Sequence, residues 1–142
     1  MIVSLPVPSV RALFLALALT AGCANEAQEA HDRAEPLSRT EFTELIENFF
    51  EYEPLEAGRP SQFRIHLTDL VEGMPVAGAD VSLKLLSGSK PVAEARARPG
   101  SVTGIYLAEL TPPGAGAVDV EFQVRTEAFD ETMTISGFSV AE

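Results

Sequence analysis

Apolar and polar residues alternate along most of the chain from Arg59 onward, which is the pattern of β-strands with one buried face. The clearest case is the segment 118–124, where valine and phenylalanine alternate with acidic and amide residues. The other segments that predict strands are 63–67, 81–85, 93–97, 103–111 and 131–140. Glycine and proline separate most of them. The pattern therefore predicts a domain of antiparallel strands joined by turns.

Two of these segments predict local features of the sheets. In one, alanines alternate with Glu94 and Arg96, which predicts an edge strand that its charged residues protect from further pairing. In the last segment the apolar positions change phase between Ile135 and Phe138, across Gly137. Such a change of phase predicts a β-bulge at the glycine.

The number and spacing of the strands indicate the fold class. About seven short strands with regular turns are typical of a single immunoglobulin-like antiparallel β-sandwich. The chain has one cysteine and no tryptophan, so the disulfide and buried tryptophan of antibody domains are both absent. A small β-barrel is the alternative architecture.

Residues 41–53 fit two patterns. Apolar residues from Phe42 to Phe50 recur at helical spacing, and Ser38 with Glu41 forms a possible capping box. Residues 49–53 also read as a strand. We predict one or two helical turns through about Asn48, followed by a strand.

The chain before this point divides into two segments. Residues 12–21 form an apolar or small run of ten residues, the length of the apolar part of a signal peptide and too short to span a membrane. A buried core helix is the alternative. Residues 24–40 contain no aromatic residue and only one large aliphatic residue, Leu37, which predicts a flexible tether. The expected organisation is a signal peptide at 1–22, a tether at 23–40 and the sandwich domain at 41–142.

The sequence Leu19-Thr20-Ala21-Gly22-Cys23 resembles the lipobox of bacterial lipoproteins, although Thr20 stands where that motif prefers an aliphatic residue. The resemblance implies cleavage before Cys23 and a diacylglycerol on its thiol. An unmodified thiol after an ordinary cleavage site is the alternative. Membrane attachment through the lipid is the first expected partner interaction, and no other cofactor is expected.

The expected location follows from the same resemblance. After cleavage the second residue is Ala24, whereas lipoproteins retained in the inner membrane commonly have aspartate there. This implies a lipid-anchored protein of the cell envelope, in the outer membrane and facing the periplasm. Cleavage removes Arg11 and no acid, so nine basic and 21 acidic residues give a net charge of about −12. That charge disfavours nucleic acid as a partner.

Two passages, Phe50–Leu70 and Met74–Val81, resemble the amino-terminal β-sandwich of periplasmic adaptor subunits of heavy-metal-type RND efflux pumps. More loosely they are similar to YtkA-like domains. The likeness covers about residues 48–140. A complete adaptor also has a helical hairpin, a lipoyl-like domain and a β-barrel, and this chain ends where they would begin. The resemblance therefore implies an accessory envelope protein that binds a protein partner in an efflux system.

Metal binding is the alternative function that the resemblance raises. Neither His31 nor His66 has a second ligand at a spacing typical of metal sites, so His66 is only a weak candidate ligand. His66 is expected to point outward from its strand beside Arg64. Met74 is expected to anchor a loop and Met133 to lie in the core.

Catalysis has little support. The sequence contains no Gly-x-Ser-x-Gly motif and no phosphate-binding loop, so no catalytic residue is proposed. A partner surface is more plausible, and Ile105 and Leu107 are its candidates if Tyr106 faces the core. A strand buried on both faces, or one covered by the helix-capable segment, is the alternative for these two residues. The leading hypothesis is a non-catalytic accessory binding module, followed by a periplasmic metal-binding or metal-handling domain and then by an enzyme.

Overall fold

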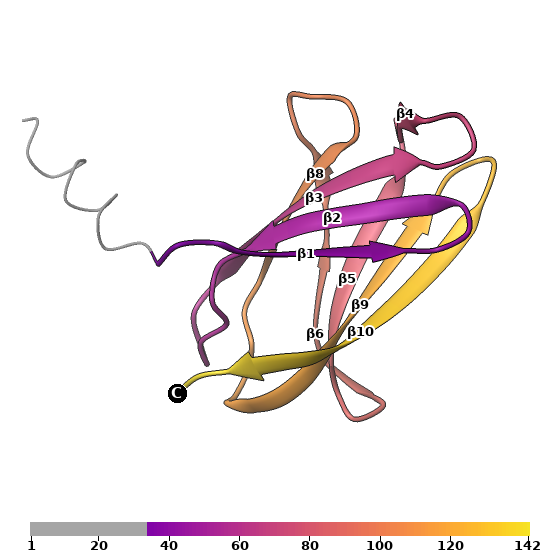
Figure 1. Ribbon diagram of the computed structural model, residues 1–142. Helices are drawn as coiled ribbons and strands as arrows, with labels where there is room; N and C mark the ends of the chain where they lie inside the picture. The colour runs from indigo at the N-terminus through magenta and orange to yellow at the C-terminus, as the bar shows by residue number, and fades with distance from the viewer. Residues whose placement is uncertain (1–33) are drawn as a thin grey trace, which may run out of the picture. The chain divides into compact units, whose positions relative to one another are not determined.

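The computed structural model describes residues 34–142 as two antiparallel β-sheets packed face to face (Figure 1). The first sheet contains, in spatial order, β1 (Leu37–Phe42), β2 (Ile46–Tyr52), β3 (Ser61–Asp69), β8 (Ile105–Leu110) and β7 (Arg98–Pro99), with β4 (Met74–Pro75) paired to β3. The second contains β10 (Asp130–Val140), β9 (Gly116–Arg125), β5 (Asp80–Ser87) and β6 (Lys90–Arg96). The predicted antiparallel sandwich is confirmed.

The strand order is that of an immunoglobulin-like sandwich. In the first sheet β2, β3, β8 and β7 take the places of strands A, B, E and D, and in the second β5, β9 and β10 take those of C, F and G. The chain changes sheets between β4 and β5, between β6 and β7, and between β8 and β9. Residues 34–142 form ten strands instead of the predicted seven, because β1, β4 and β7 were not predicted. β4 and β7 have only two residues each.

The prediction for residues 37–48 is wrong in two respects. Leu37–Thr40, placed in the tether, belong to β1, and the segment predicted as helical turns consists of the end of β1, a tight turn at 43–45 and the start of β2. The Thr43 hydroxyl oxygen accepts hydrogen bonds from the backbone N–H groups of Leu45 and Ile46, both at 3.1 Å, and thereby forms the turn. β2 pairs with both β1 and β3, so its backbone N–H and C=O groups form hydrogen bonds with neighbouring strands instead of within a helix. The spacing of apolar residues within the segment does not reveal these partners. The predicted signal peptide, Cys23 and the first part of the predicted tether lie outside the described residues.

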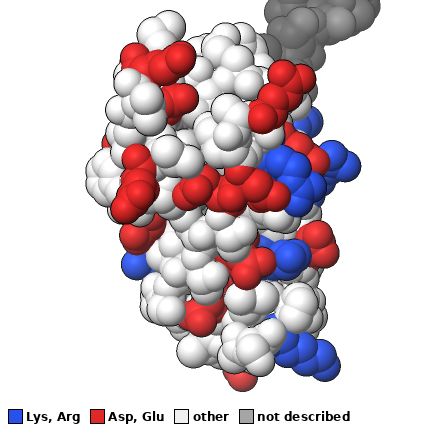
Figure 2. Space-filling view, turned by 90° about the vertical axis from the view of Figure 1, so that its right-hand side faces the viewer, with Lys and Arg blue, Asp and Glu red and all other residues white. Residues whose placement is uncertain are grey.

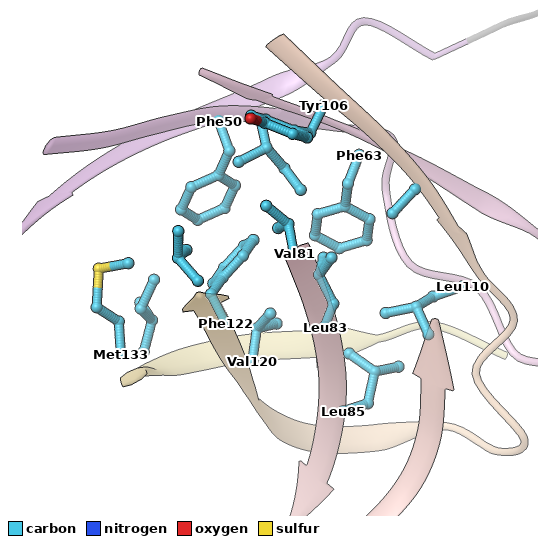
Figure 3. Packing of buried hydrophobic residues seen from close by; sticks show 14 of the residues in the cluster. Phe50, Phe63, Val81, Leu83, Leu85, Tyr106, Leu110, Val120, Phe122 and Met133 are labelled. Atoms are coloured by element: carbon cyan, nitrogen blue, oxygen red, sulfur yellow. The ribbon is translucent and has the colours of Figure 1, made fainter. Parts of the chain in front are cut away.

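Aromatic side chains occupy the centre of the core. Figure 3 shows Phe50 and Phe63 of the first sheet pointing toward Phe122 of the second. The ring centroids of Phe50 and Phe122 are 4.7 Å apart, and those of Phe50 and Phe63 are 6.4 Å apart. All three side chains are almost completely buried. Aromatic packing across the two sheets is therefore a main source of the stability of the sandwich.

The alternation in the second half of the chain is confirmed in detail. The inward residues of β9 are buried and its acidic residues are not. β6 is an edge strand with Glu94 and Arg96 exposed, as predicted. The register of β10 against β9 shifts between Ile135 and Phe138, and Gly137 has a φ of 88°, so the predicted bulge is present.

The two sheets are tied together at both sides. On one side the chain itself passes from β6 to β7, and Ala97 donates a backbone hydrogen bond of 2.8 Å to Val81. On the other side Arg39 of β1 reaches β10, where its Nη1 donates to the carbonyl of Ser136 at 2.9 Å. The guanidinium also lies 4.7 Å from the ring centroid of Phe138. A charged side chain that points inward from an edge strand also discourages unwanted pairing of that edge.

The hydroxyl of Tyr106 holds the connection between the sheets. It donates a hydrogen bond to the carbonyl of Val76 at 2.8 Å and accepts one from the N–H of Ala79 at 3.0 Å. Tyr106 is buried in β8, so this contact fastens the segment between β4 and β5 to the first sheet. Residues 75–79, within the passage Met74–Val81, thus have a defined position in the fold.

We expect Tyr106→Phe to lower the free energy of unfolding by about 1–2 kcal/mol, because it leaves two backbone groups of this connection without their partner. Chemical denaturation of the full chain would measure the change. Tyr52→Phe is the matched control, since the Tyr52 hydroxyl has no hydrogen bond among the described residues. Equal stability of the wild type and the Tyr106 variant would show that the hydroxyl does not hold this connection.

Candidate binding surface

The outer face of the first sheet carries three of the residues singled out by the sequence, His66, Ile105 and Leu107. The register of β1, β2, β3 and β8 aligns them in two rows across the sheet. One row contains Thr40, Phe49, His66 and Ile105, and the next contains Ser38, Glu51, Arg64 and Leu107. The residues between these rows, among them Phe50, Ile65 and Tyr106, face the core. The rows therefore form one continuous outward surface, which we call the sheet face.

Ile105 and Leu107 lie at one side of the sheet face. Tyr106, Ala108 and Leu110 are buried in the core, so Ile105 and Leu107 point to the opposite side of β8. Both remain partly exposed although β8 lies between β3 and β7. The predicted helical segment does not cover them, because it is part of strands β1 and β2 and of the turn between them.

His66 contacts both an aromatic and an acidic neighbour on β2. Its ring meets Phe49 edge to face with a centroid distance of 5.1 Å. Its Nε2 lies 3.7 Å from Oε2 of Glu51, and Arg64 Nη1 lies 3.8 Å from the same oxygen. His66 thus points outward beside Arg64, as the alternation predicts. Both side chains thus approach the same carboxylate oxygen, Oε2 of Glu51.

The other candidate metal ligands are not assembled with His66. Within residues 34–142 no group of three or more His, Cys, Asp and Glu side chains is arranged to hold a metal ion. Met133 is buried in the core, as predicted. Met74 is exposed on β4, so the expectation that it anchors a loop is wrong. His31 lies outside the described residues.

Acidic residues dominate the charged surface of the domain. Figure 2 looks onto the side that Figure 1 shows at its right; acidic side chains are spread over its left and centre, and basic ones lie mainly toward its right.

Hydrogen bonds from Arg125 and Gln123 hold the pKa of Asp130 below its ordinary value. Because folding lowers the pKa of Asp130, the stability that its ion pair with Arg125 contributes is present at neutral pH. This contribution is lost as the pH falls through the lowered pKa.

Asn48 is a buried polar residue that the sequence pattern did not single out. It is completely buried on the inner side of β2, between Ile46 and Phe50. Neither its side-chain nitrogen nor its side-chain oxygen has a hydrogen-bonding partner among the described residues. An unpartnered amide in a core typically costs stability relative to an apolar side chain of similar shape.

We expect Asn48→Leu to raise the free energy of unfolding by about 1 kcal/mol, because leucine has the same branching and no polar atom to desolvate. Thermal or urea denaturation would measure the gain. Asn48→Asp is the contrasting variant and should lose stability, since it would place a carboxylate in the core. A loss of stability in the leucine variant would mean that the amide makes a favourable interaction.

The chain matches no protein-family model, and no curated protein shows significant similarity to it. Among residues 34–142 no helix is long and apolar enough to cross a membrane. The described residues thus define an immunoglobulin-like β-sandwich with a mixed apolar and charged sheet face.

Proposed function

We propose that the chain is a lipoprotein of the cell envelope whose sandwich is a non-catalytic binding module for a protein partner. The sheet face is the observation that supports this proposal. It places the partly exposed side chains of Phe49, Ile105 and Leu107 beside the charged groups of Glu51 and Arg64. Apolar side chains next to charged groups are a usual composition for a protein interface.

The shape of this surface also favours a protein over a small molecule. The outward rows lie on four adjacent strands of a sheet, whose side chains stand side by side. Small ligands usually bind in concave sites that bury most of their surface, whereas a broad face suits another folded protein. An accessory role in an RND-type efflux system is the partner context that the family resemblance suggests.

The anchor is proposed from the sequence around Cys23. Cleavage before this residue and acylation of its thiol would hold the module at the outer membrane, facing the periplasm. Intact-mass measurement on membrane-purified protein tests this, with Cys23→Ala as the control. A chain that begins at Cys23 and carries acyl mass is the expected result. An unacylated wild-type chain would contradict the anchor.

The binding role can be tested in cells with a photoreactive residue. Leu107→benzoylphenylalanine should form a crosslink to an envelope protein, because this position lies on the sheet face. Thr132→benzoylphenylalanine, exposed on β10 of the second sheet, is the control. An efflux subunit as the product supports the full proposal, and another envelope protein supports the module without the efflux role. No product from any surface position of the domain would contradict a binding module.

A metal-handling domain is the second candidate, and the pairing of His66 with Glu51 favours it. Two side chains 3.7 Å apart could supply two ligands, with the others coming from a partner or from solvent. Titration of the full chain with Cu²⁺ and with Zn²⁺ tests this function. Stoichiometric binding that is lost in His66→Ala supports it, whereas binding that the variant retains would exclude this site.

A further inference from the structure

Exposed apolar side chains gather at one end of the sandwich. Among residues 34–142 six large hydrophobic residues are exposed, and all but Leu37 lie in neighbouring turns at this end or in the strand residues that border them. The five are Phe42, Leu70, Val71, Met74 and Val102, which we call the distal patch. Each exposes between 43% and 74% of its surface. Concentration of exposed apolar residues in one place is typical of an interaction site.

Backbone contacts place these turns next to one another. The N–H of Leu70, after β3, donates to the carbonyl of Leu45 in the β1–β2 turn at 2.8 Å. β4, which contains Met74, pairs with the end of β3. The loop before β8, which contains Val102, lies next to β3 and β4. The N–H of Leu67 in β3 donates a hydrogen bond to the carbonyl of Gly104 in this loop, and Gly104 packs closely against Pro75 of β4. The patch thus combines three segments that are distant in the sequence.

The turn that presents the most exposed member of the patch is itself well ordered. Oδ1 of Asp69 accepts hydrogen bonds from the N–H groups of Val71 and Glu72, at 2.8 and 3.1 Å. The N–H of Gly73 donates to the carbonyl of Asp69 at 2.8 Å. A turn fixed in this way presents Val71 with little loss of conformational entropy on binding.

The charges beside Phe42, Leu70 and Val71 in the distal patch are negative and uncompensated. Glu44, Glu47 and Glu72 lie in or beside the same turns, and none has an ion-pair partner among the described residues. Of the basic residues at this end, Arg96 and Arg125 are already ion-paired with aspartates, and the exposed Arg98 precedes the loop of Val102, on the other side of β3. A partner that covers the apolar side chains would therefore gain most from basic groups at its rim.

The charge of the patch argues against the membrane as its occupant. Glu44, Glu47 and Glu72 beside the apolar side chains would be repelled by anionic lipid.

We infer that the distal patch binds a basic, amphipathic segment of a protein partner, with the apolar side chains of that segment on Val71 and Phe42 and its lysine or arginine side chains facing Glu44, Glu47 and Glu72. This inference rests on the proposed function of the domain as a binding module. It adds a second group of residues, which adjoins Ile105 because the N–H of Ile105 donates to the carbonyl of Val102 at 3.1 Å, and it specifies the chemistry of the partner.

The test is photo-crosslinking in cells that produce the full chain. Val71→benzoylphenylalanine keeps an apolar group on an exposed turn, so the fold should be preserved. We expect a crosslink whose mapped partner peptide is rich in lysine or arginine and in apolar residues. Reversal of the three acids, by Glu44→Lys, Glu47→Lys and Glu72→Lys together, should reduce the yield at least tenfold.

The control triple is Glu94→Lys, Glu109→Lys and Glu142→Lys, which changes the net charge equally away from the patch and should preserve the yield. If the first triple lowers the melting temperature, the exposed pair Glu44→Lys and Glu72→Lys replaces it.

Several results would overturn the inference. They are equal loss in both triples, no loss in either, or a crosslink from position 71 to lipid, to a second copy or to residues 1–33 of the same chain. A crosslink from position 107 but none from position 71 would refute the distal patch and leave the proposed function standing. The absence of crosslinks from both positions and from every other surface position of the domain would refute both.

Discussion

Phe50→Ala is expected to lower the free energy of unfolding by about 3–5 kcal/mol. Phe50 is completely buried, and its ring lies within aromatic contact of Phe122 in the opposite sheet and of Phe63 and Tyr52 in its own. Truncation would remove the apolar area of the ring and leave a cavity at the point where the sheets meet. Because β-strands hold its neighbours in place, the cavity should close only partly.

Denaturant unfolding of the full chain measures this loss, and Phe42→Ala supplies a matched control. Phe42 belongs to the same β-hairpin and is 63% exposed, so its truncation should change stability by less than about 1 kcal/mol. The difference between the two variants isolates burial from the change in residue type. Similar losses in both would mean that Phe50 is not part of the central core.

Gly104→Ala is expected to cost about 3–4 kcal/mol, from backbone strain and from steric overlap together. Gly104 has a φ of 83°, a region that residues with a Cβ rarely adopt. A Cβ at this position would lie 2.7 Å from Cβ of Pro75 and 3.1 Å from the carbonyl oxygen of Leu67. That carbonyl accepts the hydrogen bond of Val76, so relief of the overlap would disturb the pairing of β4 with β3.

Gly88→Ala distinguishes the two contributions. Gly88 also has a positive φ, of 62°, but no heavy atom beyond its two chain neighbours lies within 4 Å of the position of its added Cβ. It should therefore show the backbone strain alone, about 1–2 kcal/mol. Thermal unfolding of the two variants in parallel would measure the difference. Equal destabilisation would indicate that Pro75 moves away from Gly104 at no cost.

Much of the second half of the domain follows from local pattern. The alternation in 118–124 places its valines and Phe122 inside the sandwich, and the change of phase at Gly137 predicts the bulge in β10. The charged outward residues of β6 predict an edge strand. Side-chain direction in a strand alternates strictly, so a short stretch of sequence is sufficient to predict which residues become buried.

The segment 37–48 shows where local pattern fails. The spacing of its apolar residues suits a helix, yet β1 and β2 form because β3 offers an edge for pairing and Arg39 reaches β10. Strand pairing depends on residues far away in the chain, and a helix-like spacing in one segment contains no information about them.

The sheet face and the distal patch also depend on strand pairing between distant segments. Ile105 and Leu107 could be proposed from the sequence because they alternate with Tyr106, but the neighbours that complete the sheet face come from β2 and β3. The distal patch was missed, although Leu70, Val71 and Met74 are unusually apolar for a predicted loop. The sequence by itself determines which residues are apolar and which strand face they occupy, because those properties are local. Only the tertiary structure decides which distant segments become neighbours, because strand order and register depend on long-range pairing.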